Sequence, residues 1–368
     1  MKRLESKLRS SFSLFTFFIL FISVGRAQTG APPASVGSIE DLQVPAPSIA
    51  GNLLGDPAVQ RVFVYLPPSY KRETTKRFPS LYVLHGYTGS PEEWLNKGYQ
   101  GLNLQTEMDS LIAKGLAAEM IIVVPNGRNA YLGSFYTNSV VTGNWEDYVY
   151  KDVVNYIDGR YRTLARSSSR GIAGHSMGGY GAFTLAMKHP DVFGATYALS
   201  PCCLGLEGDI SGDNPVWAKA GKVTSREAFS KPPQSFDDFF SVAMIATSAA
   251  FAPNKERPPL YVDFPYVSKN GVLTRNEPAY SNYRAKMPLY QVEKYRDNLM
   301  KLRGIFLDVG EFDEFTHIRL ATAMLSAELS KREIPHAFEI YRGGDHGNKI
   351  RERFNTKVIP FFTALLEK

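Results

Sequence analysis

The chain has 368 residues, of which 44% are hydrophobic and 21% charged, a composition typical of a globular protein with a large core. The formal net charge is +6, but residues 1–27 carry +4 of it, so the rest of the chain carries only +2. So small a positive net charge does not indicate a nucleic-acid-binding protein. The two cysteines, Cys202 and Cys203, cannot form a disulfide scaffold. We predict that they are small buried residues after a strand, with a vicinal disulfide as the alternative.

Residues 1–27 have the organisation of a secretory signal peptide. Basic residues precede an apolar run over residues 12–24, and the small residues Gly25 and Ala27 follow it. The run is shorter than the roughly 20 residues that a membrane-spanning helix needs, which favours a cleaved leader over an uncleaved anchor. We therefore predict a secreted or periplasmic protein. Its predicted parts are a signal peptide over 1–27, a Pro/Ala/Gly/Ser linker over 28–38 and one folded domain over 39–368.

Along that domain, apolar runs of strand length alternate with amphipathic stretches of helix length. Strands are predicted over residues 40–44, 59–66, 80–84, 120–124, 171–173, 195–200, 305–309 and 337–341. Helices are predicted over residues 102–116, 145–161 (with Asn144 as N-cap), 177–189, 289–302, 314–333 and 350–366. This alternation predicts one α/β domain with a mostly parallel, doubly wound sheet that begins with an antiparallel pair.

The pattern weakens over residues 204–287, which carry many aromatic side chains without the periodicity of a separate core. This stretch follows the strand predicted at 195–200, so it leaves the sheet at the carboxyl edge, where α/β proteins bind their ligands. It is also far longer than the roughly 2–6 residues of an ordinary connection in such a sheet. We predict a cap over the functional site, and the alternative is an outer layer packed on the edge of the sheet.

The sequence Gly174-His-Ser176-Met-Gly178 fits G-x-S-x-G, and it lies between a predicted strand and a predicted helix. That setting is typical of a nucleophile elbow. The sharp turn should hold Ser176 in a strained backbone conformation, while the two glycines let strand and helix pass closely. Ser176 is therefore the predicted nucleophile.

An acyl-transferring serine needs a general base and an acid that orients it. In α/β hydrolases the acid and then the histidine follow the serine along the chain. His346 lies between glycines after the last predicted strand, which makes it the predicted base. Asp313 follows the preceding strand, whereas Asp308 lies inside it, so Asp313 is the predicted acid. Glu311 and Glu314 are the alternatives.

The remaining histidines are weaker candidates for the base. His189 ends a predicted helix and His336 precedes a strand, so both are predicted to lie at the surface. His317 lies one turn into a predicted helix. His85 follows a buried strand, where we expect a structural role, and His175 adjoins the serine.

Two backbone N–H groups should form an oxyanion hole. Met177 follows the nucleophile and supplies one, and Tyr87, in the loop after the strand at 80–84, is the predicted second. Trp145, Tyr131 and His175 are further candidates for the wall of a substrate pocket.

Together these residues resemble the putative-esterase family of α/β hydrolases, which includes esterase D (S-formylglutathione hydrolase), feruloyl esterases and the mycolyltransferases. The resemblance runs from about residue 53 to the C-terminus. It rests on VYLP at 64–67, LHG at 84–86, GSFY at 133–136, NWEDY at 144–148, GHSMGG at 174–179, the glycine and aspartate at 310 and 313, and GDH at 344–346. The resemblance implies an α/β-hydrolase fold and assigns nucleophile, acid and base to Ser176, Asp313 and His346. The long insertion departs from the pattern and leaves the substrate class open.

The implied activity is that of a serine esterase, a carboxylic-ester hydrolase that works through an acyl-enzyme on a small-molecule or carbohydrate-linked ester. No metal or organic cofactor is implied, because the sequence has no Cys/His ligand cluster and no dinucleotide fingerprint. One alternative is an acyltransferase on the same scaffold, like the mycolyltransferases. Another, from a different class, is a secreted carbohydrate-binding protein with an inactive elbow. The oligomeric state is left open.

Overall fold

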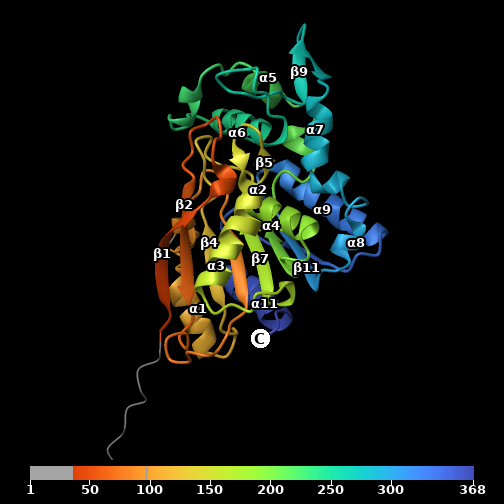
Figure 1. Ribbon diagram of the computed structural model, residues 1–368. Coiled ribbons are helices and arrows are strands. Elements are labelled where there is room, and N and C mark those ends of the chain that lie inside the picture. Colours follow the sequence, from red (N-terminus) through yellow and green to blue (C-terminus); the bar gives the residue numbers. More distant parts are fainter. Residues whose placement is uncertain (1–35, 96–97) are drawn as a thin grey trace, which may run out of the picture. The chain divides into compact units, whose positions relative to one another are not determined.

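The computed structural model describes residues 36–95 and 98–368 (Figure 1). The predicted signal peptide and residues 28–35 of the predicted linker lie outside these residues, and the last linker residue, Ser38, begins β1. No helix in the described part of the chain is long and apolar enough to cross a membrane.

Within the described residues, eight strands form the central sheet in the order β1-β2-β4-β3-β7-β8-β11-β12. β2 pairs antiparallel with both β1 and β4, and the remaining neighbours pair parallel. The prediction of a mostly parallel sheet with an antiparallel start is therefore confirmed. The strands are β1 (Ser38–Pro45), β2 (Val59–Leu66), β3 (Ser80–Leu84), β4 (Ile121–Pro125), β7 (Arg170–His175), β8 (Ala195–Leu199), β11 (Gly304–Gly310) and β12 (Ala337–Tyr341).

Helices cover both faces of this sheet, as the predicted doubly wound architecture requires. α1, α10 and α11 pack on one face, and α3, α4 and α9 pack on the other. The alternating side chains of β2 show why two layers form, because Val62 and Val64 join one core and Phe63 and Tyr65 join the other. These helices are α1 (Leu104–Ala113), α3 (Val154–Arg160), α4 (Met177–Lys188), α9 (Thr316–Lys331), α10 (Ile350–Arg353) and α11 (Ile359–Leu365).

Two predicted helices contain π-helical turns. The predicted 145–161 helix consists of α2 (Trp145–Asp147), a π-helical turn (Tyr148–Val153) and α3, while a second π-helical turn (Phe354–Val358) joins α10 to α11. Asn144 does occupy the N-cap position, but its side chain makes no capping hydrogen bond.

The helix predicted over 289–302 is wrong. This segment contains only a 3-10 turn (Pro288–Tyr290) and the short α8 (Arg296–Leu299), with turns between them. The buried side chains of Leu289, Val292 and Leu299 have a spacing that also fits a helix, so the apolar pattern could not distinguish the two. Other 3-10 turns lie at Pro47–Ile49, Pro91–Trp94, Ser167–Ser169, Gly208–Ile210 and Arg226–Phe229.

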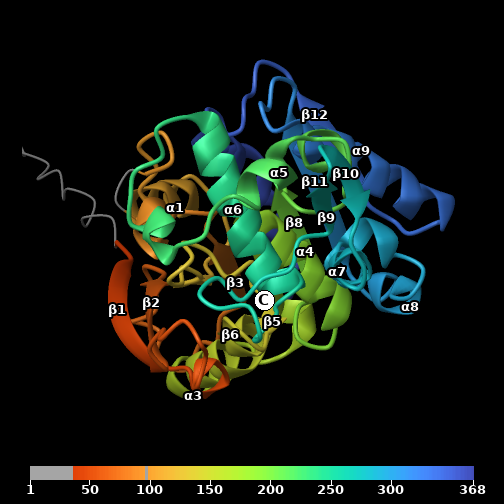
Figure 2. The same ribbon diagram turned by 90° about the horizontal axis from the view of Figure 1, so that it is seen from above.

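The inserted stretch 204–287 stands above one end of the sheet in Figure 1. Seen from above, α6 runs across the ends of the central strands (Figure 2). The insertion contains α5 (Val216–Ala220), α6 (Phe236–Phe251), the hairpin β9 (Tyr266–Lys269) and β10 (Val272–Arg275), and α7 (Ala279–Lys286). A second small hairpin, β5 (Asn138–Ser139) with β6 (Gly143–Asn144), precedes α2.

Candidate active site

The nucleophile elbow has the geometry that the sequence predicts. Ser176 lies between β7 and α4 with φ 57° and ψ −115°, in a backbone region that side chains rarely adopt. Its N–H donates to the carbonyl of Leu199 at 3.0 Å, which ties the turn to β8. A Cβ atom on Gly174 would collide with the backbone of Gly178, and one on Gly178 would collide with the carbonyl of Leu84. Both glycines are therefore required by close backbone approach.

The structure brings Asp313 and His346 together. The Nδ1 atom of His346 lies 2.8 Å from Oδ2 of Asp313, and the other carboxylate oxygen accepts the Phe315 N–H at 3.0 Å. The Asp313 side chain is fully buried, while 15% of the His346 side chain is exposed. An Nδ1–H donated to the carboxylate leaves Nε2 of His346 as a proton acceptor.

The loops that carry these two residues are held against each other. A Cβ atom on Gly310 would contact the carbonyl of Gly344, so the loop after β11 and the loop after β12 meet at backbone distance. Glu314 accepts the N–H of His346 at 3.1 Å, and Glu311 accepts an N–H of the same loop at 3.2 Å. The two alternative acids thus brace the backbone of the histidine loop rather than its ring.

Asp308 faces away from His346. Its carboxylate accepts the Tyr197 hydroxyl at 2.7 Å and the Nε–H of Arg353 at 2.9 Å. Burial raises the pKa of Asp308 to about 6, although Arg353 acts in the opposite direction. Asp308 therefore belongs to a buried ion pair between the sheet and α10.

The predicted oxyanion hole has suitable backbone geometry. A Cβ atom on Gly86 would lie 3.5 Å from Cβ of Ser176, so the loop that carries Tyr87 passes directly beside the serine. Met177 is the first residue of α4, where amides lack helical partners. Among the hydrogen bonds of the described residues, none uses the N–H of Tyr87 or of Met177.

The side chain of His175 contacts the backbone of the loop after β12, which carries His346. Its Nε2 lies 2.7 Å from the backbone carbonyl of His346, and the two rings are 4.6 Å apart. Burial, and then the neighbouring His346, hold the pKa of His175 well below its ordinary value. A neutral His175 can donate this hydrogen bond without placing a second positive charge beside the candidate base.

A cavity of about 310 Å³ contains Ser176 and His346. Its wall is largely aromatic and apolar, which suits the organic part of an ester. Helix α6 supplies five of the lining residues, so the inserted stretch takes part in the site. The lining also includes Tyr87, Tyr99, Phe135, His175, Cys202, Cys203, Phe239, Phe240, Ala243, Met244, Thr247, Phe315, His317 and Ile318.

Two of the predicted pocket residues do not line this cavity. Trp145 is fully buried in the core, and its Nε1–H donates to the carbonyl of Thr142 at 2.7 Å. Tyr131 is also fully buried, stacks on Phe229 and donates its hydroxyl to the carbonyl of Leu260 at 3.0 Å. Both side chains serve internal packing, so their assignment to the pocket was wrong, whereas His175 does line the cavity.

The structure separates the other histidines by role. His85 is structural as predicted, because the N–H of Gly127 donates to its Nε2 at 2.8 Å inside the core. His189 and His336 are half-buried, the former against Glu146 and the latter against Ser326. His317 is the residue that the sequence reasoning missed, because it lines the cavity. No local sequence pattern gave this role away, because His317 is the second residue of α9 and its partner Asp209 lies far away in sequence.

The two cysteines follow β8 as free, buried thiols. Their sulfur atoms lie 2.7 Å apart, and both residues line the cavity. The N–H of Cys202 donates to the carbonyl of Ser176 at 3.1 Å, so the segment after β8 helps to hold the elbow. Burial raises the pKa of the Cys202 thiol well above its ordinary value.

With the fold and the site in view, the chain can be placed among known proteins. The family model described as "Putative esterase" matches residues 58–361, most of the chain. The chain belongs to this family. The matched residues include the elbow at Ser176, the loop that carries Asp313 and the loop that carries His346.

Relatives in this family match part of the chain. An esterase of Mycobacterium tuberculosis strain H37Rv is 31% identical over 132 residues, which are 35% of this chain and 26% of that protein. The endo-1,4-beta-xylanase/feruloyl esterase of Xylanibacter ruminicola is 29% identical over 139 residues, 37% of this chain and 19% of that enzyme. The S-formylglutathione hydrolase of Arabidopsis thaliana is 28% identical over 145 residues, 38% of this chain and 50% of that protein. The chain thus matches half or less of the length of each of these relatives.

Solved structures extend the likeness to the whole fold. A ferulic acid esterase superposes with a TM-score of 0.62 at 22% identity, covering 91% of this chain and 100% of that one. The S-formylglutathione hydrolase of Agrobacterium tumefaciens superposes with a TM-score of 0.60 at 16% identity, covering 92% and 99%. The chain therefore has the α/β-hydrolase fold of esterases, as the sequence resemblance implied.

Proposed function

We propose that this protein hydrolyses carboxylic esters through an acyl-enzyme formed on Ser176. The observation that carries the proposal is the Asp313–His346 pair, joined at 2.8 Å, in the same cavity as a serine on a strained elbow. In this reading Ser176, Asp313 and His346 form a catalytic triad.

The reaction would proceed in two steps. The Ser176 hydroxyl attacks the ester carbonyl while Nε2 of His346 takes its proton, and Asp313 stabilises the resulting imidazolium. The N–H groups of Tyr87 and Met177 hold the oxyanion, each donor contributing about 3 kcal/mol. His346 then gives its proton to the departing alcohol. Water, activated by the same histidine, releases the acid from Ser176.

The cavity suggests a compact acyl group. Its volume of about 310 Å³ lies at the small end of ligand pockets, and its aromatic wall favours a flat or branched apolar group. Relatives are named feruloyl esterase and S-formylglutathione hydrolase. The first substrates to test are therefore esters of small acids with small alcohols, thiols or carbohydrates. Within the proposal, α6 acts as a cap that selects among them.

Labelling with a fluorophosphonate probe tests the proposed nucleophile. The protein should gain one adduct by intact mass, and Ser176→Ala should lose both the adduct and the hydrolysis of p-nitrophenyl acetate. The exposed Ser281→Ala is a matched control, because it also removes one hydroxyl and lies outside the cavity lining. Retention of the adduct by Ser176→Ala would refute the assignment.

We further propose that residues 1–27 direct export and are then removed. The support is the basic stretch followed by the apolar run over 12–24 and small residues. Expression of the full chain in a bacterial host should place active protein in the periplasm or the medium. Its N-terminal sequence should begin near residue 28, and a protein retained in the cytoplasm with residues 1–27 intact would contradict this.

A further inference from the structure

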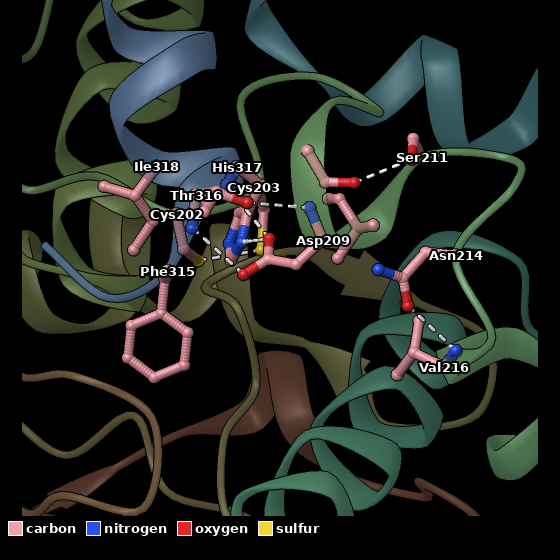
Figure 3. A network of polar contacts seen from close by, with 12 residues as sticks. Cys202, Cys203, Asp209, Ser211, Asn214, Val216, Phe315, Thr316, His317 and Ile318 are labelled. Atoms are coloured by element: carbon pink, nitrogen blue, oxygen red, sulfur yellow. Dashed lines mark hydrogen bonds and ion pairs between the residues drawn. The ribbon is translucent and has the colours of Figure 1, made fainter.

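A second carboxylate–histidine pair lies in the wall of the candidate active site. Nδ1 of His317 is 2.5 Å from Oδ1 of Asp209, and His317 lines the same cavity as Ser176 and His346. Figure 3 shows Asp209, which belongs to the 3-10 turn Gly208–Ile210, with its carboxylate directed at the first residues of α9 and at the His317 ring. The proposed two-step reaction uses neither residue, so the pair needs a separate explanation.

Asp209 is held in a fixed position. Its two carboxylate oxygens accept the N–H groups of Thr316 and His317 at 3.0 and 2.9 Å, and its own N–H donates to the Thr316 hydroxyl at 3.0 Å. Burial raises the pKa of Asp209, but the bonds from His317 and from the two amides outweigh it and the net pKa is lowered. The carboxylate is therefore charged at neutral pH and accepts a hydrogen bond from the Nδ1–H of the ring.

The ring of His317 is equally constrained. Only 3% of the residue is exposed, and the ring stacks on Phe240 of α6 and meets the edge of Phe315. Within the described residues, its Nε2 has no hydrogen-bond partner. The free thiols of Cys202 and Cys203, which line the same cavity, are hydrogen-bonded to each other and not to this atom. A polar atom that has no protein partner and belongs to a residue of the cavity wall is available to a ligand.

The chemistry of the ring selects the kind of group it can bind. With its Nδ1–H donated to Asp209, the neutral ring presents a lone pair at Nε2, which requires a hydrogen-bond donor. The surrounding Met244 and Ile318 are apolar and would penalise a charged ammonium donor. A neutral hydroxyl group meets both conditions.

We propose that His317, positioned by Asp209, accepts a hydrogen bond from a hydroxyl group on the acyl part of the ester. This inference rests on the proposed esterase function, because it assumes that an acyl group on Ser176 occupies the cavity. It makes His317 a specificity-determining residue and Asp209 its positioning residue. A merely structural pair, which ties the insertion to α9, would affect all substrates alike.

Matched esters distinguish the two roles. The kcat/KM values are compared for methyl cinnamate and its 2-, 3- and 4-hydroxy derivatives, and for methyl butyrate and methyl 3-hydroxybutyrate. We expect the protein to prefer at least one hydroxylated ester over its parent by about tenfold, the effect of one good hydrogen bond. His317→Phe keeps the ring packing and removes the acceptor, so it should abolish that preference while the parent ester is still hydrolysed.

Controls separate the possible failures. His336→Gln changes a histidine outside the cavity lining and should leave the preference intact. If His317→Phe does not fold, Asp209→Asn provides the second test, because the amide no longer fixes the ring tautomer and the preference should fall several-fold. The inference is overturned if the unsubstituted protein shows no preference for a hydroxylated ester. It is also overturned if the preference survives His317→Phe or Asp209→Asn, or if these variants lose activity equally on every ester. Failure to hydrolyse even the parent esters would instead remove the proposed function.

Discussion

Asp308 and Asp313 are close in sequence, but their carboxylates bind different partners. Asp308 lies within β11, so its side chain follows the alternation of the strand and reaches Arg353 of α10. Asp313 lies beyond the strand, where the loop is free to turn toward the histidine loop. The position of each residue relative to the strand end therefore decides which carboxylate can orient His346, and the sequence alone contained that information.

The two aspartates should respond differently to the loss of charge. Asp313→Asn should lower kcat by about 10³- to 10⁴-fold, because an amide no longer fixes the catalytic tautomer of His346. Asp308→Asn should leave kcat within about tenfold and lower the thermal unfolding temperature instead, since Arg353 loses a buried partner. Steady-state kinetics and thermal melts of both variants check this, and a larger kcat loss in folded Asp308→Asn would reverse the assignment.

Aromatic residues near the elbow were harder to place from sequence. Trp145 lies in a segment that carries the family resemblance, and Tyr131 lies in the loop before it, but each satisfies its polar atom with a backbone carbonyl inside the core. His317 was passed over because its helical position looked ordinary. Side-chain direction around a helix start depends on a distant partner, here Asp209, and no local pattern reveals that partner.

At the scale of elements, strands were predicted more accurately than helices. The bounds of β2, β3 and β12 agree with the predicted ranges, because a short apolar run flanked by turn residues is a local signal. Helix α6 was not predicted as a helix, since its side chains from Phe240 to Phe251 are nearly all buried. A helix that is apolar on all sides lacks the periodicity on which the prediction depends.

Helix α6 gives a direct test of the proposed cap. Ala243 lines the cavity and is buried, so Ala243→Leu would add three carbon atoms to the wall of the pocket. We expect kcat/KM for long-chain or aromatic p-nitrophenyl esters to fall at least tenfold while the acetyl ester changes less than threefold. The acetyl ester is the internal control for folding and chemistry. Equal effects across the ester series would show that α6 does not contact the acyl group.

At the scale of the whole molecule, the parallel strands explain why the candidate residues meet. The elbow follows β7, the acid loop follows β11 and the histidine loop follows β12, so all three leave the same edge of the sheet. The alternation of strands and helices was enough to predict this edge. The shape of the cavity was not predictable, because it depends on how the insertion packs over the edge, and that packing involves contacts between residues far apart in sequence.

Acid stability should depend on His85, which is buried between β3 and the loop after β4. The Gly127 N–H donates to its Nε2 at 2.8 Å, so a proton on that atom would break the bond. Burial lowers the pKa of His85 to about 4. Below pH about 6.5 the unfolded chain therefore binds a proton that the folded protein excludes, and the free energy of unfolding falls as the pH falls toward 4.

The size of this effect follows from the pKa difference. Each pH unit inside the window contributes about 1.4 kcal/mol, so acidification from pH 7 to pH 5 should cost on the order of 2 kcal/mol through His85. His85→Gln retains a side chain that can accept the Gly127 N–H but does not titrate, and it should remove that part of the pH dependence. Urea unfolding at pH 7 and pH 5 measures it. Ser139→Ala is the control, because this buried hydroxyl does not titrate and its loss should lower stability equally at both pH values. An unchanged difference between the two pH values in His85→Gln would show that another group is responsible for the acid sensitivity.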